Sequence, residues 1–405
     1  MMVQVQYFPY FQPIIDINRM AIMGYEALAR TRDKNDRVAS IGALFSDPDF
    51  DRRELLTIDR SVREQALAYF AKSQHDVFLS LNLSPEWMDH IGDDTPVPTI
   101  AMTHKWGVDP SRILIEFVEG AGNNDNMQKL LARYRAEGMR IAIDDFGAGS
   151  SHLDRIIALE PDIIKLDMNL FKRAMAGGIS QEVVQSIAHL ARRTGSELLC
   201  EGVETEQEFY FALECGARYV QGYFFWPALP EFIDPDSPKE IIRLLLEGFV
   251  KRNLNREKQL MQYMQEMEHY FLSVQSALKD TELNYNSLHQ APHGFARVFV
   301  CRHNGIQISP NYELSHHAED QCIWQVDDSN RGSNWSMRPY FYQALAAKEL
   351  QHKNQVASQP YRDVRSGRMC QTIGKVLSND RILFAAILCL DDDDSDRQGN
   401  GFYRR

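Results

Sequence analysis

The chain has few of the features that would place it in a specialised class at once. Its six cysteines contain no CxxC pair, so the spacing typical of zinc and dithiol sites is absent. Six cysteines in 405 residues are also too few for a disulfide scaffold, and we expect them to be reduced. The longest apolar run, Ile382–Leu390, has the length of a strand and is too short to span a membrane.

The chain also has fewer basic than acidic residues: 44 Lys and Arg against 56 Asp and Glu, which gives a net charge of −12. An acidic surface repels a phosphate backbone, so we expect no nucleic-acid polymer as a partner. The N-terminus has no basic segment followed by an apolar core, which argues against a signal peptide. Together these absences predict a cytoplasmic protein without a membrane span.

What the first 230 residues do contain is an alternation of short β-branched runs with amphipathic helical runs. Such alternation predicts a parallel sheet, either open or closed into a barrel. The predicted strands are Val77–Leu83, Arg112–Val118, Arg140–Asp145, Asp162–Asp167, Glu197–Glu201 and Tyr219–Phe224. The clearest predicted helices are Asp51–Lys72, Asp125–Glu137, Gln181–Thr194 and Glu206–Gly216.

Polar residues at the strand ends favour the barrel. Nearly every predicted strand ends in such a residue, among them Asn82, Glu116, Asp145 and Glu201. Polar groups in that position converge on one face of a (β/α)8, or TIM, barrel, whereas an open sheet concentrates its site at one switch point. The sequence also has neither a GxGxxG dinucleotide loop nor a P-loop. We therefore expect a TIM-type barrel.

The sequence changes character after Trp226. Prolines punctuate a connector up to Pro238, and a helical pattern follows to about Asp280. Within the helix, a short heptad seam is formed by Leu260, Met264, Met267, Phe271, Val274 and Leu278. The seam fits either a helix packed on its own domain or a dimer interface or signalling helix.

The last part of the chain is rich in predicted strands. They are Ala296–Cys301, Gln307–Ser309, Ile323–Val326, Met369–Val376 and Ile382–Leu390, with one helix over Tyr340–Leu350. This mixture predicts an α+β sensor module. We therefore divide the chain into a barrel (1–236), a helical linker (237–285) and a sensor domain (286–405).

An oxygen-rich donor set is expected at the mouth of the barrel: Glu26, Asn82, Glu116, Asp144, Asp145 and Glu201. So many acids repel one another unless cations lie between them. Carboxylate and amide oxygens suit Mg²⁺ or Mn²⁺, and the absence of histidine from the set disfavours zinc. Two such ions can activate water for in-line attack on a phosphodiester, with Lys165 adding a positive charge.

Motifs in a fixed order connect this chemistry to a known family. They are Phe11–Ile14 (FQPI), Tyr25–Arg30 (YEALAR), Leu81–Ser84 (LNLS), Ile115–Glu119 (IEFVE), Asp144–Gly149 (DDFGAG), Lys165–Asp167 (KLD), Glu201–Thr205 (EGVET) and Gln221–Tyr223 (QGY). Over residues 3–232 the chain resembles the EAL domain of cyclic-di-GMP phosphodiesterases. The resemblance implies a modified TIM barrel that hydrolyses cyclic-di-GMP to linear pGpG with two Mg²⁺ or Mn²⁺ ions.

The resemblance also implies roles for individual residues. The ligands of one metal are matched by Glu26, Asn82, Glu116 and Asp144, and those of the second by Asp144, Asp145 and Glu201. Lys165 and Glu201 match residues that contact and activate the attacking water, and Gln221 matches one that orients water at the metals. The positions that contact substrate are matched by Gln12, Leu28, Arg30 and Glu204.

Glu119 matches the anchor of the loop after the aspartate pair, which links metal binding to a dimer interface in this family. The chain departs from the family pattern in and around this loop. Val118 and Gly120 replace Thr and Ser, Ser150–His152 replaces Tyr-Ser-Ser, and Phe225–Pro227 replaces an aromatic-Ser-x-Pro segment. The complete metal set favours an active, dimeric enzyme. The altered loop leaves open a receptor that binds cyclic-di-GMP with little hydrolysis.

The C-terminal part has a resemblance of its own. Asn334–Phe341 (NWSMRPYF), followed by Tyr361–Asp363 (YRD), is similar to PAS/Cache-type sensors and, more closely, to the C-terminal domain of YkuI-type EAL proteins. The resemblance implies that Trp335, Arg338 and Tyr340 contact an unknown small ligand. The alternative is that the aromatic residues belong to the core and that Arg338 pairs with a structural acid.

Overall fold

The computed structural model describes residues 6–32, 37–45, 47, 49–83, 96–118, 124–148, 153–316, 322–350, 355–363, 366–377 and 380–389. The chain divides into two compact units, residues 1–250 and 251–405. The finer division into barrel, linker and sensor domain remains a prediction.

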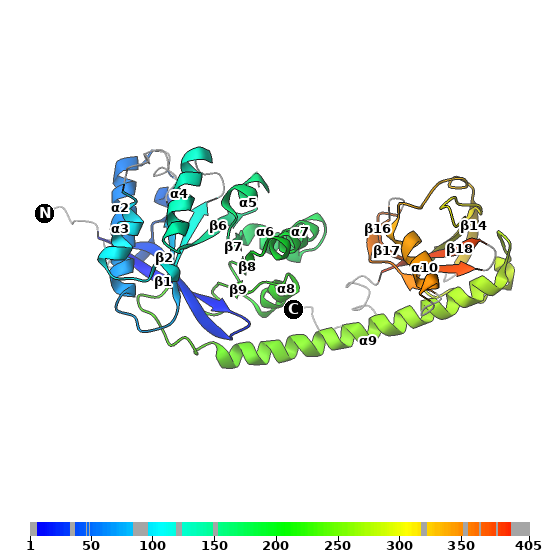
Figure 1. Cartoon of the computed structure of the whole chain (residues 1–405). Helices are drawn as coiled ribbons and strands as arrows, with labels where there is room; N and C mark the ends of the chain where they lie inside the picture. Colours follow the sequence, from blue (N-terminus) through cyan, green and yellow to red (C-terminus); the bar gives the residue numbers. More distant parts are fainter. Residues whose placement is uncertain are drawn as a thin grey trace. The chain divides into compact units, whose positions relative to one another are not determined.

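The first unit is a closed barrel (Figure 1). In the described part of the chain, the ring is formed by β1 (Tyr7–Asp16), β2 (Ala21–Arg32), β4 (Phe78–Leu83), β5 (Ile113–Val118), β6 (Arg140–Phe146), β7 (Ile163–Leu166), β8 (Glu197–Cys200) and β9 (Tyr219–Val220). Strand β1 runs antiparallel to both of its neighbours, β2 and β9, whereas the other pairs in the ring are parallel. The predicted modified TIM barrel is therefore confirmed. Strand β3 (Val38–Ser40) pairs with β2 outside the ring.

Helices follow the strands and lie outside the barrel (Figure 1). They are α1 (Gly42–Phe45), α2 (Arg52–Phe70), α3 (Pro98–Lys105), α4 (Asn124–Ala136), α5 (Leu153–Leu159), α6 (Met168–Met175), α7 (Ile179–Thr194) and α8 (Glu206–Glu214). The strands and helices predicted for this unit all coincide with observed ones, although β9 ends four residues early. The N-terminal strands β1, β2 and β3 were not among the predicted elements.

One apolar side chain from almost every strand fills the interior of the barrel, at a level closer to the N-terminal ends of the parallel strands than the polar residues described below. This floor consists of Ile14, Phe78, Leu114, Ala142, Ile163, Leu199 and Tyr219, with Met23 packed against it. Gly24 belongs to the same level, and a Cβ there would lie 2.3 Å from the ring of Phe78. The floor fixes the level at which the next inward-facing residues stand, two positions further along each strand.

The second unit contains an antiparallel sheet in the order β14-β13-β12-β18-β17-β15, with β16 also paired to β17. The strands are β12 (Phe295–Arg302), β13 (Asn311–His316), β14 (Cys322–Asp327), β15 (Val356–Ala357), β16 (Tyr361–Arg362), β17 (Met369–Leu377) and β18 (Arg381–Leu388). A small hairpin, β10 (Leu278–Lys279) and β11 (Glu282–Leu283), precedes them. The segment Gln307–Ser309 was wrongly predicted as a strand, since Gln307 makes only an isolated bridge to Cys301.

Helices cover both faces of this sheet. Helix α10 (Pro339–Glu349) packs on the face that carries Phe299 and Phe384. The C-terminal part of α9 (Lys239–Ala277) packs on the face that carries Val298 and Leu383. Residues that alternate along β12 and β18 therefore serve two different cores.

The heptad seam of α9 is used within this unit. Met267, Phe271 and Val274 are all 0% exposed and belong to the core formed with β12 and β18. Leu260, at the start of the seam, is 37% exposed. The packing of a helix on its own domain therefore accounts for the seam from Met264 to Leu278. Among the described residues, no helix combines the length and the apolar character needed to cross a membrane.

Candidate functional site

A ring of polar side chains stands directly above the apolar floor of the barrel. Because side chains alternate along a strand, the residue two positions from each floor residue also faces inward. On the parallel strands each of these residues comes two positions after the floor residue in the sequence. On β1, which is antiparallel, it comes two positions before. The ring comprises Gln12, Glu26, Ser80, Glu116, Asp144, Lys165, Glu201 and Gln221.

Lys165 occupies the centre of this ring and is 1% exposed. Its Nζ lies 2.7 Å from Oε1 of Glu201, 2.8 Å from Oδ1 of Asp144 and 2.9 Å from Oε2 of Glu116. A fourth carboxylate, that of Glu26, is 3.5 Å away. One ammonium thus links acids from four different parts of the barrel wall.

The acids in and beside this ring are crowded together, and their pKa values differ from the usual ones. Burial raises the pKa of Glu201 to about 8, partly opposed by the Lys165 ammonium. Burial and the neighbouring Glu26 charge raise the pKa of Glu116 well above its usual value. Burial also raises the pKa of Asp145 to about 6, helped by the charge of Asp144. Cations placed between these carboxylates would lower their pKa values and favour the ionised forms.

For Lys165 the same surroundings favour the charged form. Burial alone would lower its pKa, but the surrounding carboxylates raise it well above the usual value, so the ammonium stays charged. Burial would raise the pKa of Glu26, yet the Lys165 charge and two hydrogen bonds hold it below the usual value. Those bonds come from Nδ2 of Asn82 (2.9 Å) and Nε2 of Gln221 (2.7 Å).

Asp144 and Asp145 lie on the same side of the chain although they are adjacent in a strand. The register between β6 and β7 shifts between Ile143 and Phe146, and Asp145 has a φ of 52°. This irregularity breaks the alternation that would otherwise point the two side chains in opposite directions. As a result, carboxylate oxygens of Asp144, Asp145 and Glu201 lie within 4.8 Å of one another.

The donor set fits divalent cations that prefer oxygen. Five carboxylates and one ammonium, Lys165, give the site a formal charge of −4, counting Glu26, Glu116, Asp144, Asp145 and Glu201. Within the described residues, the buried Oε1 of Gln221 has no hydrogen-bond partner, which leaves one more acceptor at the ring. Hard cations such as Mg²⁺ or Mn²⁺ match these ligands.

A cavity of about 420 Å³ opens beside the ring and could hold a small molecule. Leu28, Arg30 and Asn82 line it together with Asp144 and Asp145. It therefore joins two of the predicted substrate-contacting residues to the predicted metal ligands.

Of the other two predicted substrate-contacting residues, Gln12 belongs to the ring and Glu204 follows β8 in the chain. Oε1 of Gln12 accepts a hydrogen bond of 3.2 Å from Gln221. Glu204 is 44% exposed at its side chain and forms an ion pair of 2.9 Å with Lys172. Glu119 and the loop residues 149–152 lie outside the described residues.

Two members of the site were missed by sequence reasoning. Oγ of Ser80 donates a hydrogen bond of 2.6 Å to Glu116, and the position of Ser80 two residues before Asn82 could have revealed it. Arg63 of α2 is 3% exposed, lines the cavity and donates to the carbonyl oxygen of Asn82 (3.3 Å). Arg63 stands three and four positions before the buried Ala66 and Leu67, so the apolar periodicity of α2 could have marked it as a buried arginine.

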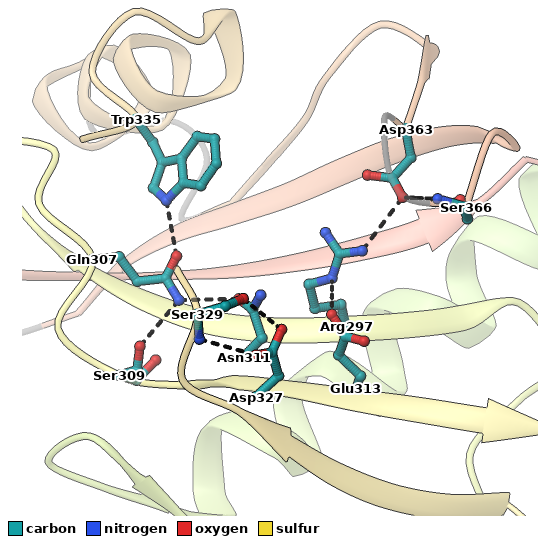
Figure 2. A network of polar contacts seen from close by, with 10 residues as sticks. All are labelled: Arg297, Gln307, Ser309, Asn311, Glu313, Asp327, Ser329, Trp335, Asp363 and Ser366. Carbon is teal, nitrogen blue, oxygen red and sulfur yellow. Dashed lines mark hydrogen bonds and ion pairs between the residues drawn. The ribbon is translucent and has the colours of Figure 1, made fainter. Parts of the chain in front are cut away.

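In the second unit, the three predicted sensor residues have different environments. Tyr340, in the first turn of α10, is buried in the core between this helix and the sheet, as the core alternative expected. Trp335 is half-buried and donates a hydrogen bond of 2.8 Å from Nε1 to Oε1 of Gln307 (Figure 2). Arg338 is exposed and forms no ion pair among the described residues, so its expected pairing with a structural acid is not observed. All three line one cavity.

Comparison with protein families identifies two matching regions. A family described as "EAL domain" matches residues 2–228, and one described as "EAL-domain associated signalling protein domain" matches residues 232–389. YkuI of Bacillus subtilis, an uncharacterized EAL-domain containing protein, is 26% identical over 391 residues, covering 93% of each chain. The probable cyclic di-GMP phosphodiesterase PdeI of Escherichia coli is 28% identical over 231 residues, which are 55% of this chain but 29% of PdeI.

Solved structures give the same pattern of similarity. The crystal structure of Bacillus subtilis YkuI, in complex with c-di-GMP and calcium, superposes with a TM-score of 0.80 at 23% identity, covering 95% of this chain and 96% of YkuI. A standalone EAL protein from Vibrio cholerae, in its c-di-GMP-bound form, superposes with a TM-score of 0.50 at 26% identity, covering 57% of this chain and 97% of its own. The first of these similarities extends the shared fold beyond the barrel.

Proposed function

The chain belongs to the EAL-domain family, and from this premise we propose that it hydrolyses cyclic-di-GMP to linear pGpG with the help of two divalent cations. The observation that carries the proposal is the ring of acids around Lys165, whose Nζ lies between 2.7 and 3.5 Å from four carboxylates. The similarity to PdeI, a probable cyclic di-GMP phosphodiesterase, and to the Vibrio cholerae protein in its c-di-GMP-bound form supports cyclic-di-GMP as the ligand.

The chain offers two overlapping sets of ligands for the cations. One set is Glu26, Asn82, Glu116 and Asp144, and the other is Asp144, Asp145 and Glu201. Mg²⁺ or Mn²⁺, when bound, supplies positive charge that polarises the phosphodiester and makes water a better nucleophile. Gln221 and Asn82 hold the Glu26 carboxylate in a fixed orientation for this purpose.

The other groups of the site act on the substrate and on the water. Arg30, at the cavity wall, offers a forked guanidinium to a phosphate, and Leu28 offers an apolar surface beside it. Gln12 and Glu204 complete the proposed substrate contacts. Lys165 holds a positive charge next to the attacking water and the phosphate, and Glu201 takes part in removing the proton of the water. The water oxygen forms a bond to phosphorus as the P–O3′ bond breaks, and O3′ takes up a proton from solvent and leaves as a hydroxyl group.

Product analysis of the full chain tests this proposal. Purified protein is incubated with cyclic-di-GMP and Mg²⁺ or Mn²⁺, and the products are separated by chromatography. We expect pGpG from the parent and from the control Lys239→Ala, which removes an exposed lysine. We expect none from Lys165→Ala or Glu26→Ala. Cleavage at the parental rate by Glu26→Ala would contradict the ligand assignment.

A receptor is the second candidate function, because the loop after the aspartate pair departs from the family pattern. Binding of cyclic-di-GMP without pGpG, measured by calorimetry on the same preparation, would favour it. In either case we propose that the C-terminal domain regulates the barrel through α9, and that the chain acts as a homodimer. Light scattering that gives the mass of one chain at micromolar concentration would overturn the homodimer.

A further inference from the structure

A second cavity lies within the C-terminal unit, in a part of the chain that the proposed phosphodiesterase reaction does not use. It has a volume of about 430 Å³, which is in the range of small-molecule sites. The start of α10 and the strands β12 and β16 contribute its wall, through Arg338, Arg297 and Tyr361 among others. Every residue that lines it belongs to the described part of this unit.

A chain of hydrogen bonds beside the cavity fixes the orientation of two buried amides (Figure 2). The indole of Trp335 can only donate, and its Nε1 lies 2.8 Å from Gln307, so Oε1 of Gln307 must face it. Nε2 of Gln307 therefore faces Asn311 and donates to Oδ1 of that residue (3.0 Å) and to the carbonyl oxygen of Ser309 (3.0 Å). Asn311 must in turn present its oxygen to Gln307 and its nitrogen elsewhere.

The remaining nitrogen, Nδ2 of Asn311, is a donor without a partner. Asn311 is 1% exposed, and among the described residues its Nδ2 has no hydrogen-bond acceptor. Figure 2 shows this nitrogen on the side of Asn311 away from Gln307, and Asn311 lines the same cavity as Trp335 and Arg297. Buried donors are rarely left unpaired, so this one calls for an acceptor in the cavity.

The charge of the lining points to an anionic acceptor. Three arginines, Arg297, Arg338 and Arg362, face one carboxylate, Asp363, in a chain whose net charge is −12. Arg297 is already held by Glu313 (3.0 Å) and Asp363 (3.3 Å). The guanidinium of Arg338 makes no ion pair within the described residues and remains available to a ligand.

The rest of the lining is aromatic and apolar. The rings of Phe299 and Trp335 have centroids 6.4 Å apart, and those of Tyr340 and Tyr361 are 6.3 Å apart. All four residues line the cavity. A bare inorganic anion would leave these faces uncovered, whereas a ligand with an apolar body would bury them.

We propose that this cavity binds a small organic carboxylate. Its carboxylate accepts a hydrogen bond from Nδ2 of Asn311 and pairs with the guanidinium of Arg338. Its apolar body lies against Trp335 and Tyr361. The proposal does not depend on the activity of the barrel, and the experiment that tests it contains no cyclic-di-GMP.

The test measures binding to the full chain by calorimetry. The probes are benzoate, phenylacetate and 4-methylpentanoate, each beside its neutral primary amide, with inorganic phosphate as an anion that has no apolar body. We expect at least one carboxylate to bind saturably with one site per chain, at least ten-fold tighter than its amide and than phosphate. If no carboxylate exceeds its amide, or if phosphate binds equally well, the proposal is wrong.

Two substitutions locate the site. Arg338→Gln changes an exposed residue, and Asn311→Asp keeps the oxygen that Gln307 requires but turns the free donor into an acceptor. Both should weaken carboxylate binding at least ten-fold, while Lys348→Gln on the last turn of α10 should leave it unchanged. Circular dichroism checks the fold, and if Asn311→Asp is unfolded, Arg338→Gln decides alone. Unaltered binding by Arg338→Gln would overturn the proposal.

Discussion

Gln221 donates a hydrogen bond of 2.7 Å from Nε2 to Oε2 of Glu26, although the two residues are 195 positions apart. The bond crosses the closure of the barrel, since Gln221 follows β9 and Glu26 lies on β2. It orients a carboxylate that is proposed to bind metal. Residues that hydrogen-bond to a metal ligand without touching the metal affect the affinity of the site for the ion.

Replacement of Gln221 by Leu should therefore weaken metal binding rather than abolish catalysis outright. We expect the Mg²⁺ concentration needed for half-maximal activity to rise roughly 10–100-fold, with part of the activity restored at high Mg²⁺. Activity measured across a Mg²⁺ titration checks this. Gln207→Leu, on the exposed surface of α8, serves as the control. A loss of activity that no concentration of Mg²⁺ relieves would indicate a direct role for Gln221 in the reaction.

Lys165 has a structural role that can be separated from catalysis by removing the metal. Replacement by Met leaves the acids around it without a counter-charge, at a cost on the order of 3 kcal/mol to the free energy of unfolding. Mg²⁺ should restore stability more in this variant than in the parent, because it supplies the missing positive charge. Urea denaturation with and without Mg²⁺ measures both quantities, beside Lys239→Met. Equal stability of parent and variant in EDTA would refute the expectation.

Much of the barrel site could be predicted because two simple regularities generate it. Parallel strands bring their C-terminal ends to one face, and a side-chain period of two brings Glu116, Lys165 and Glu201 to the same level above the floor. Both regularities act locally along the chain. For that reason they are visible in a single sequence.

Gln12 shows where this reasoning ends. Strand β1 runs antiparallel to its neighbours, so the mouth of the barrel lies toward its N-terminal end and the rule about C-terminal ends does not apply. Pro9 and Pro13 also speak against a strand, and the residues of Glu26–Arg30 are helix formers by propensity. Closure of the barrel overrides these local preferences.

Asn311 illustrates a second limit. Its free donor follows from contacts with Gln307 and, through it, with Trp335, which lies 24 residues further along the chain. Trp335 itself was singled out from the sequence, but its hydrogen-bond partner was not. Partners that meet only after two elements have packed leave no periodic signal.

Tyr25 fixes the connector after the barrel, and its removal should be measurable as lost stability. Its hydroxyl donates to the carbonyl oxygen of Ile233 (2.9 Å) and accepts from the amide of the same residue (3.0 Å). Tyr25→Phe leaves both backbone groups of the half-buried Ile233 without this partner, at a cost of about 1–3 kcal/mol in the free energy of unfolding. Tyr223→Phe, at a residue that is 69% exposed, should have little effect.

The stability that the Tyr25 hydroxyl contributes should also fall at high pH. Burial raises the pKa of Tyr25 to about 12, from about 10 in the unfolded chain. The contribution of this phenol to stability is therefore complete below about pH 10 and declines as the pH rises toward 12. The difference in urea midpoint between parent and Tyr25→Phe should shrink between about pH 8 and about pH 11. A gap that stays constant would contradict the assignment.

Phe271 and Leu272 test how the heptad seam of α9 is used. Phe271 is 0% exposed in the core of the C-terminal unit, whereas its neighbour Leu272 is 45% exposed. Phe271→Ala should destabilise this unit by about 3–5 kcal/mol, because a large cavity opens in a packed core. Leu272→Ala should change stability by less than about 0.5 kcal/mol.

Hydrogen exchange of the amides in β12 and β18 measures this local stability, and light scattering measures the mass of each variant. We expect Phe271→Ala to accelerate exchange and to leave the mass unchanged, since the seam is occupied within its own chain. A drop in mass with unaltered exchange would instead assign the seam to an interface between chains. Since Phe271 and Met267 already pack on β12 and β18, the proposed homodimer needs a surface other than these two residues.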